Sequence, residues 1–316
     1  MYTIGIDVGG TNLKAGLVNE TFDIVATKKM PLVWESPEKF AEDLCVLATG
    51  LVEENGISRE EVAYIGMGVP GVVDVKRGMI VKTVNIPIRN VPVAELIHRV
   101  WEIPVFLGND ADCAALGEFY HFEKKDIESL ILVTLGTGVG TGLIFNGKIH
   151  RGINGCAGEG GHMVIVSGGD LCTCGRRGCW ERYASANGLI RLTKAAMEEN
   201  RQSVMWSLAD GSLDKVDGRT AFNAAREGDA AAKAVVDQYL TYLAEGLTNL
   251  INLLQPEVIC IGGGVSNEAD EALLFPLRGK VEEMRYDKDT QVHTQIVKAS
   301  LGNDAGIIGA ALLGRE

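Results

Sequence analysis

The chain has 316 residues, of which 46% are hydrophobic and 23% charged, and its formal net charge at pH 7 is -12. This length and composition predict a folded protein of one large or two ordinary domains and exclude intrinsic disorder. The acidic charge argues against nucleic acid as the main partner. The sequence has no basic and apolar signal region at its start and no apolar run long enough to span a bilayer, so we expect a cytoplasmic protein without membrane contact.

Hydrophobic periodicity and turn residues predict alternating strands and helices in the first part of the chain. Three strands come first, over residues 2–7, 12–18 and 24–33. Ser36-Pro37 is a helix cap followed by a proline in the first turn, which predicts a helix that runs to about Glu54 and ends before Gly56. The next expected elements are a strand at 64–69, a helix at 93–101, a strand at 105–107 and a helix at 111–122.

The same order of elements begins again at Ser129. An apolar strand over 129–135, a glycine-rich turn over 136–142 and a returning strand over 143–145 lead to the hairpin signal Asn146-Gly147. Because strand, glycine turn and returning strand occur in this order twice, we expect an α/β protein with two related lobes and a cleft between them. The remaining expected elements are helices at about 181–200, 220–227 and 229–254, a strand at 258–261 and a closing helix at 302–313.

Four potential metal ligands lie close together in the sequence: His162, Cys172, Cys174 and Cys179. Three thiols and one imidazole are the ligand set of a closed tetrahedral zinc site, and since no position is left for water, we expect a structural zinc ion. The alternative is a disulfide with a spare thiol, which requires an oxidising compartment. The zinc would fix a loop in which Glu159 and Glu181, together with His162, are the polar groups best suited to read a substrate.

Two glycine turns are suited to bind phosphate. Glycine lets the backbone approach a ligand closely and present its N–H groups to phosphate oxygens. The second turn, Leu135–Gly142, has four glycines at every second position, and neither turn fits the dinucleotide or P-loop fingerprint. For the first turn an ordinary hairpin is the alternative; otherwise its Asp7 could hold magnesium and its other polar or glycine residues could face phosphate: Gly9, Gly10, Thr11 and Asn12.

Two further segments follow predicted strands. Asp110 is the better candidate for a general base, whereas Asp112 suits the role of a helix N-cap, and the sequence leaves the choice between the two carboxylates open. Gly262, Gly263 and Gly264 follow a buried strand and are suited to close approach by a flat ring such as adenine. A plain loop into a helix is the alternative for these glycines.

The ordered set of motifs resembles a known family. The segments G-I-D-V-G-G-T-N, G-N-D-A-D-C-A-A-L-G-E, L-G-T-G-V-G-T-G, G-E-G-G-H and C-x-C-G-x-x-G-C-x-E are similar to those of the ROK sugar kinases, within the actin-like ATPase superfamily, over residues 4 to about 313. The subgroup it most resembles is the bacterial ATP-dependent glucokinases. The resemblance implies two ribonuclease-H-like lobes, 1–117 with a C-terminal helix at 301–316 and 118–300, that close over sugar and nucleotide. It also implies ATP, Mg²⁺ and structural Zn²⁺ as cofactors and a homodimer or homotetramer.

The resemblance also implies roles by motif position. Asp110 would be the catalytic base that accepts the proton of the sugar's 6-hydroxyl, and His162 would serve zinc through one ring nitrogen and sugar through the other. The residues that would hydrogen-bond sugar hydroxyls are Asn85, Asn109, Glu159, His162 and Glu181. The nucleotide would be held by the turn at 9–12, by Thr137 and Gly138, by Asp7 through magnesium, and by the glycines at 262–264.

The resemblance leaves the sugar open. Asn85-Ile86-Pro87 stands where the family usually has Asn-Leu followed soon by Trp, so Ile86 and the missing Trp depart from the pattern. Glucose is the first expectation, while fructose, allose and N-acetylmannosamine present similar rings of hydroxyls, and polyphosphate in place of ATP is also open.

Two further classes of protein use a related fold. A sugar-sensing transcriptional regulator of the same family carries an added N-terminal helix-turn-helix, whereas this sequence reaches its first strand by Tyr2, is acidic and has Asp110. An actin-like ATPase without a sugar substrate would leave Glu159, His162 and Glu181 unexplained. Both are therefore less favoured than a kinase.

Overall fold

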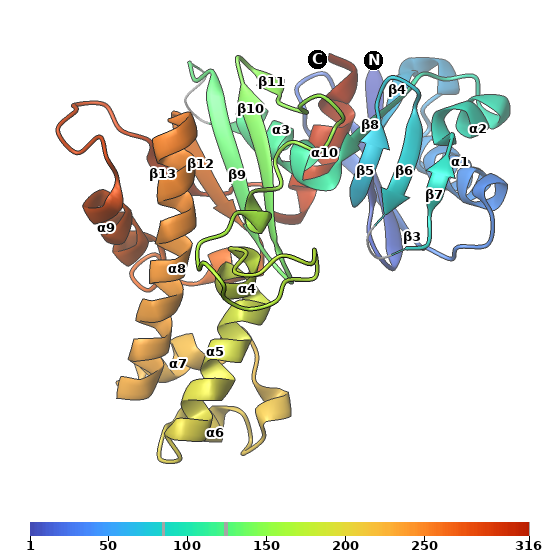
Figure 1. Cartoon of the computed structure of the whole chain (residues 1–316). Helices are drawn as coiled ribbons and strands as arrows, with labels where there is room; N and C mark the ends of the chain where they lie inside the picture. Colours follow the sequence, from blue (N-terminus) through green and yellow to red (C-terminus); the bar gives the residue numbers. More distant parts are fainter. Residues whose placement is uncertain (84–85, 123–125, 316) are drawn as a thin grey trace. The chain divides into compact units, whose positions relative to one another are not determined.

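The computed structural model describes residues 1–83, 86–122 and 126–315 and contains three β-sheets flanked by helices (Figure 1). The first sheet has the order β3-β2-β1-β4-β8, and its strands are β1 (Tyr2–Val8), β2 (Asn12–Val18), β3 (Ile24–Pro31), β4 (Val62–Val69) and β8 (Val105–Asn109). The second has the order β11-β10-β9-β12-β13, and its strands are β9 (Ser129–Leu135), β10 (Val139–Phe145), β11 (Lys148–Ile149), β12 (Val258–Gly262) and β13 (Gln295–Lys298). A small third sheet consists of β5 (Gly71–Asp74), β6 (Met79–Thr83) and β7 (Arg89–Val91).

Both five-stranded sheets have the same strand order, namely third, second, first, fourth and fifth along the chain. In the first sheet β1 pairs antiparallel with β2 and parallel with β4, and β4 pairs parallel with β8. The predicted α/β class and the predicted repeat of two ribonuclease-H-like lobes are therefore confirmed.

The chain divides into two compact units: residues 1–130, 142–158 and 300–316 form the first, and residues 131–141 and 159–299 form the second. The lobe boundaries expected near residues 117 and 300 stay a prediction, because compactness does not define which parts close on a substrate. The helices are α1 (Pro37–Glu54), α2 (Val93–Val100), α3 (Asp110–His121), α4 (Glu181–Ala184), α5 (Ala186–Glu199), α6 (Met205–Leu208), α7 (Thr220–Arg226), α8 (Ala230–Leu254), α9 (Leu274–Met284) and α10 (Ala305–Leu312).

Helix α1 of the first unit begins and ends where its sequence predicts. The Ser36 hydroxyl accepts a hydrogen bond from the Lys39 N–H at 3.1 Å, Pro37 occupies the first turn, and Gly56 follows the helix with a φ of +69°. Its apolar residues recur every three or four positions, so one face is buried in the core of the unit: Phe40, Leu44, Leu47 and Leu51.

Helix α10 packs unusually closely in the first unit, beside α3 (Figure 1). A Cβ on Gly309 would overlap the carbonyl of Cys113 in α3, and one on Gly117 would lie 2.5 Å from the Ala305 carbonyl oxygen. Because the two backbones touch, any side chain at these glycines would push the helices apart. The small residues of the last helix are thus explained by packing.

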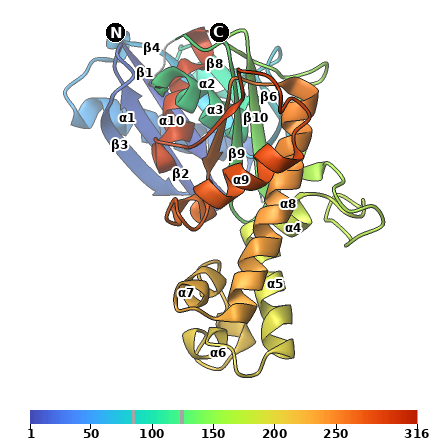
Figure 2. The ribbon, with the colours of Figure 1, turned by 90° about the vertical axis from the view of Figure 1, so that its left-hand side faces the viewer.

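The second unit contains a helical extension in which α5 and α8 lie side by side in both views (Figures 1 and 2). Helix α8 starts at its N-cap Asp229, which accepts from the Ala232 N–H at 2.8 Å, and it ends at Gln255 in a left-handed conformation, immediately before Pro256. Trp180 is fully buried, and Gly246 of α8 leaves room for its indole ring.

Some element predictions differ from the structure. The glycine turn expected over 136–142 is shorter, because β10 already begins at Val139. The helix expected over 181–200 is two helices, since Ser185 caps α5 by accepting the Gly188 N–H at 3.0 Å. Strands β5, β6, β7 and β13 and helices α6 and α9 carry weak periodic signals and were not predicted. Among the described residues, no helix combines the length and the apolar character needed to cross a membrane.

Candidate functional site

The structure brings the four predicted zinc ligands together in the second unit. One ligand atom from each of His162, Cys172, Cys174 and Cys179 lies within 4.8 Å of all the others. The Cys172 Sγ is 3.6 Å from the His162 Nδ1, and the Cys174 Sγ is 3.6 Å from the Cys179 Sγ. None of the seven cysteines, all of which lie in the described part of the chain, forms a disulfide, so the disulfide alternative is not what the structure shows.

These distances fit a tetrahedral zinc ion. Zinc bonds of about 2.3 Å to sulfur and about 2.0 Å to nitrogen place neighbouring ligand atoms about 3.5–3.8 Å apart. Burial raises the pKa of the Cys179 thiol to about 12, whereas a backbone N–H of Arg176 lowers the pKa of the Cys174 thiol. A bound zinc ion holds its cysteine ligands as thiolates, so Cys179 would lose its proton when zinc binds.

The two ring nitrogens of His162 face different side chains. It ends the short 3₁₀ turn Gly160–His162, and while its Nδ1 faces Cys172, its Nε2 lies 3.9 Å from a carboxylate oxygen of Glu159. The Glu159 side chain is 63% exposed and is therefore accessible to a ligand. Nδ1 is thus the ring nitrogen placed to bind a metal together with Cys172, while the expected contact of the other nitrogen with a substrate stays a prediction.

Glu181 contacts the glycine-rich turn of its own unit. Its Oε2 accepts a hydrogen bond from the Val139 N–H at 3.1 Å, and its Oε1 lies 3.9 Å from the Cys172 Sγ. A Cβ on Gly138 would overlap the Glu181 carboxylate, which explains a glycine at that position. The sequence motifs did not reveal this connection, because it joins residues 42 positions apart.

The first predicted phosphate turn is a tight β1–β2 turn. The Gly9 N–H donates to the Asn12 carbonyl at 2.9 Å, and the Asn12 side chain donates to the Thr11 hydroxyl at 2.8 Å, while Gly10 and Thr11 are exposed. Burial raises the pKa of Asp7 above its ordinary value, and the charge of Lys14 offsets part of that effect. A carboxylate that is costly to ionise in its own environment is suited to bind a cation, although an oxygen-ligand set for magnesium is not complete in this turn alone.

The acidic residues at the start of α3 lie in different environments. Asn109 is the N-cap: its Oδ1 accepts from the N–H groups of Ala111 at 2.8 Å and Asp112 at 3.3 Å, and its Nδ2 donates to the Gly71 carbonyl at 3.0 Å. The N-cap role predicted for Asp112 is therefore wrong. Asp112 is 4% exposed, whereas Asp110 is exposed at the first residue of the helix.

The remaining predicted site residues divide between the described and the undescribed parts of the chain. Thr137 and Gly138 form the turn between β9 and β10. Gly263 follows β12 with a φ of +85°, and a Cβ there would lie 2.5 Å from the Leu135 carbonyl oxygen, so both its conformation and its neighbour require glycine. Gly262 ends β12, and no atom would lie within 4 Å of a Cβ on Gly264. Asn85 lies outside the described residues.

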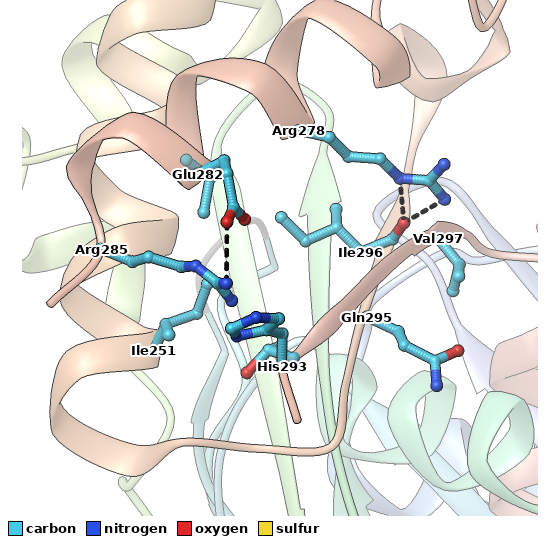
Figure 3. A pocket seen from close by; sticks show the side chains of 10 residues that line it. Ile251, Arg278, Glu282, Arg285, His293, Gln295, Ile296 and Val297 are labelled. Atoms are coloured by element: carbon cyan, nitrogen blue, oxygen red, sulfur yellow. Dashed lines mark hydrogen bonds and ion pairs between the residues drawn. The ribbon is translucent and has the colours of Figure 1, made fainter. Parts of the chain in front are cut away.

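A separate pocket of about 270 Å³ lies in the second unit between α8, α9 and residues 293–297 (Figure 3). None of the predicted site residues lines it. Arg285 is 3% exposed and donates to Glu282 at 2.9 Å, and its Nε is 3.7 Å from Asp287. Arg278 donates from its Nε to the carbonyl of Ile296 on the edge strand at 2.8 Å. Because acidic groups or a backbone carbonyl engage both arginines, we interpret the pocket as structural.

Comparisons with known proteins identify the family. The ROK family matches residues 3–316. A glucokinase of Streptomyces coelicolor is 36% identical over 316 residues, which cover 99% of this chain and 98% of that protein. The crystal structure of a ROK family glucokinase from Streptomyces griseus in complex with glucose and AMPPNP is similar with a TM-score of 0.81 and 35% identity, and the match covers 100% of both chains. The xylose repressor of Bacillus subtilis is 29% identical over 98% of this chain and 75% of its own length. On the strength of the full-length family match and these relatives, this chain belongs to the ROK family.

Proposed function

We propose that this chain is an ATP-dependent hexokinase-type phosphotransferase and that it phosphorylates the 6-hydroxyl of D-glucose. The observation that carries the proposal is the match, over the whole chain at 35% identity, to a glucokinase whose structure holds glucose and AMPPNP. AMPPNP is an analogue of ATP, so that relative was captured with both kinds of substrate. The zinc-ligand geometry and the two glycine turns support the same assignment.

Asp110 is the proposed catalytic base. Transfer of a phosphoryl group to a hydroxyl requires a carboxylate within hydrogen-bond reach of the hydroxyl proton. Asp110 is exposed at the head of α3, where a sugar could reach it, while Asp112 is buried two residues later. Burial thus favours Asp110 over Asp112, a choice that the sequence left open.

The nucleotide is assigned to the glycine segments. Backbone N–H groups of residues 9–12 and of Thr137 and Gly138 would hold the phosphates, and the glycines at 262–264 would contact the adenosine. Asp7 would hold magnesium, directly or through water, and the ion would supply the positive charge that an acidic protein needs beside a polyphosphate. Little covalent chemistry remains for the protein, so its residues act by positioning the two substrates.

The sugar is assigned to polar groups near the zinc loop and α3. Glu159, Glu181 and the Nε2 of His162 would hydrogen-bond hydroxyls, as would Asn85 and the second amide proton of Asn109. Structural zinc, held by His162 and the three cysteines, would keep the loop rigid, so that these groups meet the sugar already oriented. Zinc with four protein ligands has no open position, and it therefore has no direct part in the transfer.

Initial rates with ATP and a panel of glucose, mannose, fructose, allose and N-acetylmannosamine test the proposal. We expect glucose to have the highest kcat/KM. If none of these hexoses is phosphorylated, the kinase assignment is wrong, and if another hexose is preferred, only the choice of glucose is wrong. Asp110→Asn is the control that separates this activity from a contaminating kinase.

A sugar-sensing regulator is the alternative, since the xylose repressors share much of this sequence. Binding of promoter DNA in a gel-shift assay, without turnover of any hexose, would favour it. The expected dimer or tetramer stays a prediction, which sedimentation analysis can check. A cytoplasmic location is part of the proposal because the reaction consumes ATP.

A further inference from the structure

The turn between β9 and β10 consists of three residues, Gly136, Thr137 and Gly138. Within the turn the Gly136 N–H donates to the Gly138 carbonyl at 3.0 Å, and two of its three residues have no side chain to anchor it. Glycine loses more conformational freedom on ordering than any other residue, so such a turn needs neighbours to hold it in one shape. We call residues 136–138 the phosphate turn and residues 159–186 the zinc loop.

The zinc loop contacts the phosphate turn and the start of β10 from two sides. At one side, the Glu181 carboxylate accepts the Val139 N–H at 3.1 Å, and the Ala186 N–H donates to the Gly136 carbonyl at 2.9 Å. On the other side, the Gly160 N–H donates to the Thr141 hydroxyl at 2.9 Å, and a Cβ on Gly161 would overlap the Val139 carbonyl. Both ends of the turn are thus tied to the zinc loop.

The same carboxylate also lies next to the metal ligands. Glu181 is two residues after Cys179, and its Oε1 is 3.9 Å from the Cys172 Sγ, while its Oε2 holds Val139. The zinc loop, which the four metal ligands would hold in place, therefore contains a side chain that also holds the start of β10 next to the phosphate turn. A role limited to reading sugar hydroxyls would not require this bond to the turn.

We infer that Glu181 is a positioning residue for nucleotide binding: it transmits the rigidity of the zinc loop to the phosphate turn, so that zinc supports ATP binding even without sugar. This inference rests on the proposed function, because it takes the turn at 136–138 to bind phosphate. It adds to the expected role of Glu181 toward sugar. It also predicts that loss of zinc weakens the binding of both ATP and sugar.

Three variants test the inference. Glu181→Ala removes the acceptor of the Val139 N–H, whereas Glu181→Gln keeps a carbonyl oxygen that can accept it. Asp170→Asn is the matched control, because Asp170 also lies in the zinc loop but its carboxylate pairs with Arg191 at 2.7 Å instead of with the phosphate turn. The measurements are calorimetric affinity for magnesium AMPPNP without sugar, hydrogen exchange of the amides at 136–141, and separate KM values for ATP and glucose.

We expect Glu181→Ala to weaken the binding of AMPPNP by about tenfold or more, as for loss of one hydrogen bond to a charged group. Exchange at Val139 should become faster in the same variant. Glu181→Gln should stay within about threefold of the wild type, and Asp170→Asn should bind AMPPNP unchanged. Removal of zinc by a chelator should reproduce the Glu181→Ala result in the wild type, and added zinc should reverse it.

The inference is wrong if Glu181→Ala loses affinity only for glucose while AMPPNP binding and exchange at 136–141 match the wild type. If that variant does not fold, the chelator experiment decides, since unchanged exchange at 136–141 after zinc removal would equally refute the inference. Neither binding nor exchange depends on turnover. A wild-type protein that phosphorylates no hexose would therefore overturn the proposed function and leave the inferred link between loop and turn to be judged separately.

Discussion

Glu118 of α3 offers a test of how the first unit is held together. Its side chain is 2% exposed, and its two oxygens accept hydrogen bonds from the Ser300 N–H at 2.9 Å, the Ser300 hydroxyl at 3.0 Å and the Leu301 N–H at 2.8 Å. These donors lie immediately before α10, where the chain re-enters the first unit after Ala299. Glu118→Ala removes all three bonds at once.

The expected loss can be worked from these contacts. A hydrogen bond to a charged group contributes about 1.5–3 kcal/mol, but such values are not additive, and Ser300 is exposed enough to bind water instead. We therefore expect Glu118→Ala to lower the free energy of unfolding by about 3 kcal/mol. At roughly 2–4 °C per kcal/mol for a domain of this size, Tm should fall by about 6–12 °C. Urea denaturation followed by circular dichroism, with a thermal scan, measures both.

The control is Glu95→Ala, the same substitution at an exposed helical glutamate that pairs with Arg99. A surface pair of this kind contributes less than about 1 kcal/mol, so Tm should change by only a few degrees. Equal effects of the two substitutions would show that the three bonds of Glu118 do not stabilise the return of the chain, and the reasoning would fail.

Three other substitutions test the proposed site. Asp110→Asn should lower kcat by about 10²–10⁴-fold with little change in glucose affinity, measured by calorimetry, and retained turnover would move the base role to another group. Cys174→Ser should lower zinc content and Tm together, and native protein that contains no zinc by elemental analysis would contradict the metal assignment. Asp7→Asn should raise Tm but weaken magnesium-dependent ATP binding. The folded protein binds the Asp7 proton more tightly than the unfolded chain does, because burial raises the pKa of Asp7. The stability that this group contributes at acidic pH is therefore lost as the pH rises from the ordinary carboxyl pKa through the raised one. If Asp7→Asn leaves Tm unchanged at pH 7, the ionised Asp7 does not destabilise the fold and this reasoning is wrong.

Local sequence signals predicted much of the fold. Ser36-Pro37 marked the start of α1, Asn146-Gly147 forms the β10–β11 turn with φ values of +52° and +71°, and Pro256 follows the end of α8. The metal ligands could be found because three of them lie within eight residues. Signals of this kind depend on neighbours in sequence, and for that reason they were reliable.

Contacts between distant segments could not be predicted in the same way. A sequence does not tell which neighbour requires a given glycine. Gly138 makes room for the Glu181 carboxylate, Gly142 lies against the Ala111 backbone, and Gly309 lies against Cys113. The four alternating glycines after Leu135 suggested one long ligand-binding turn, although two of them belong to β10. Their neighbours come from helices that lie far away in the sequence, so only the structure separates packing glycines from those suited to a ligand.

Helix α3 shows the same limit for charged residues. Asp110, Asp112 and Glu118 are all carboxylates on one helix, yet the first is exposed at its head, the second is 4% exposed and the third is 2% exposed and holds the chain before α10. The Glu118 carboxylate is buried and accepts three hydrogen bonds from residues 300 and 301, whereas a base must be accessible to a substrate hydroxyl, as the exposed position of Asp110 allows. Glu118 lies eight residues, or about 12 Å, beyond Asp110 on the same helix, so we expect that loss of the contact before α10 also shifts Asp110. With Asp110 as the proposed base, Glu118→Ala should therefore lower kcat more than it raises the KM for glucose.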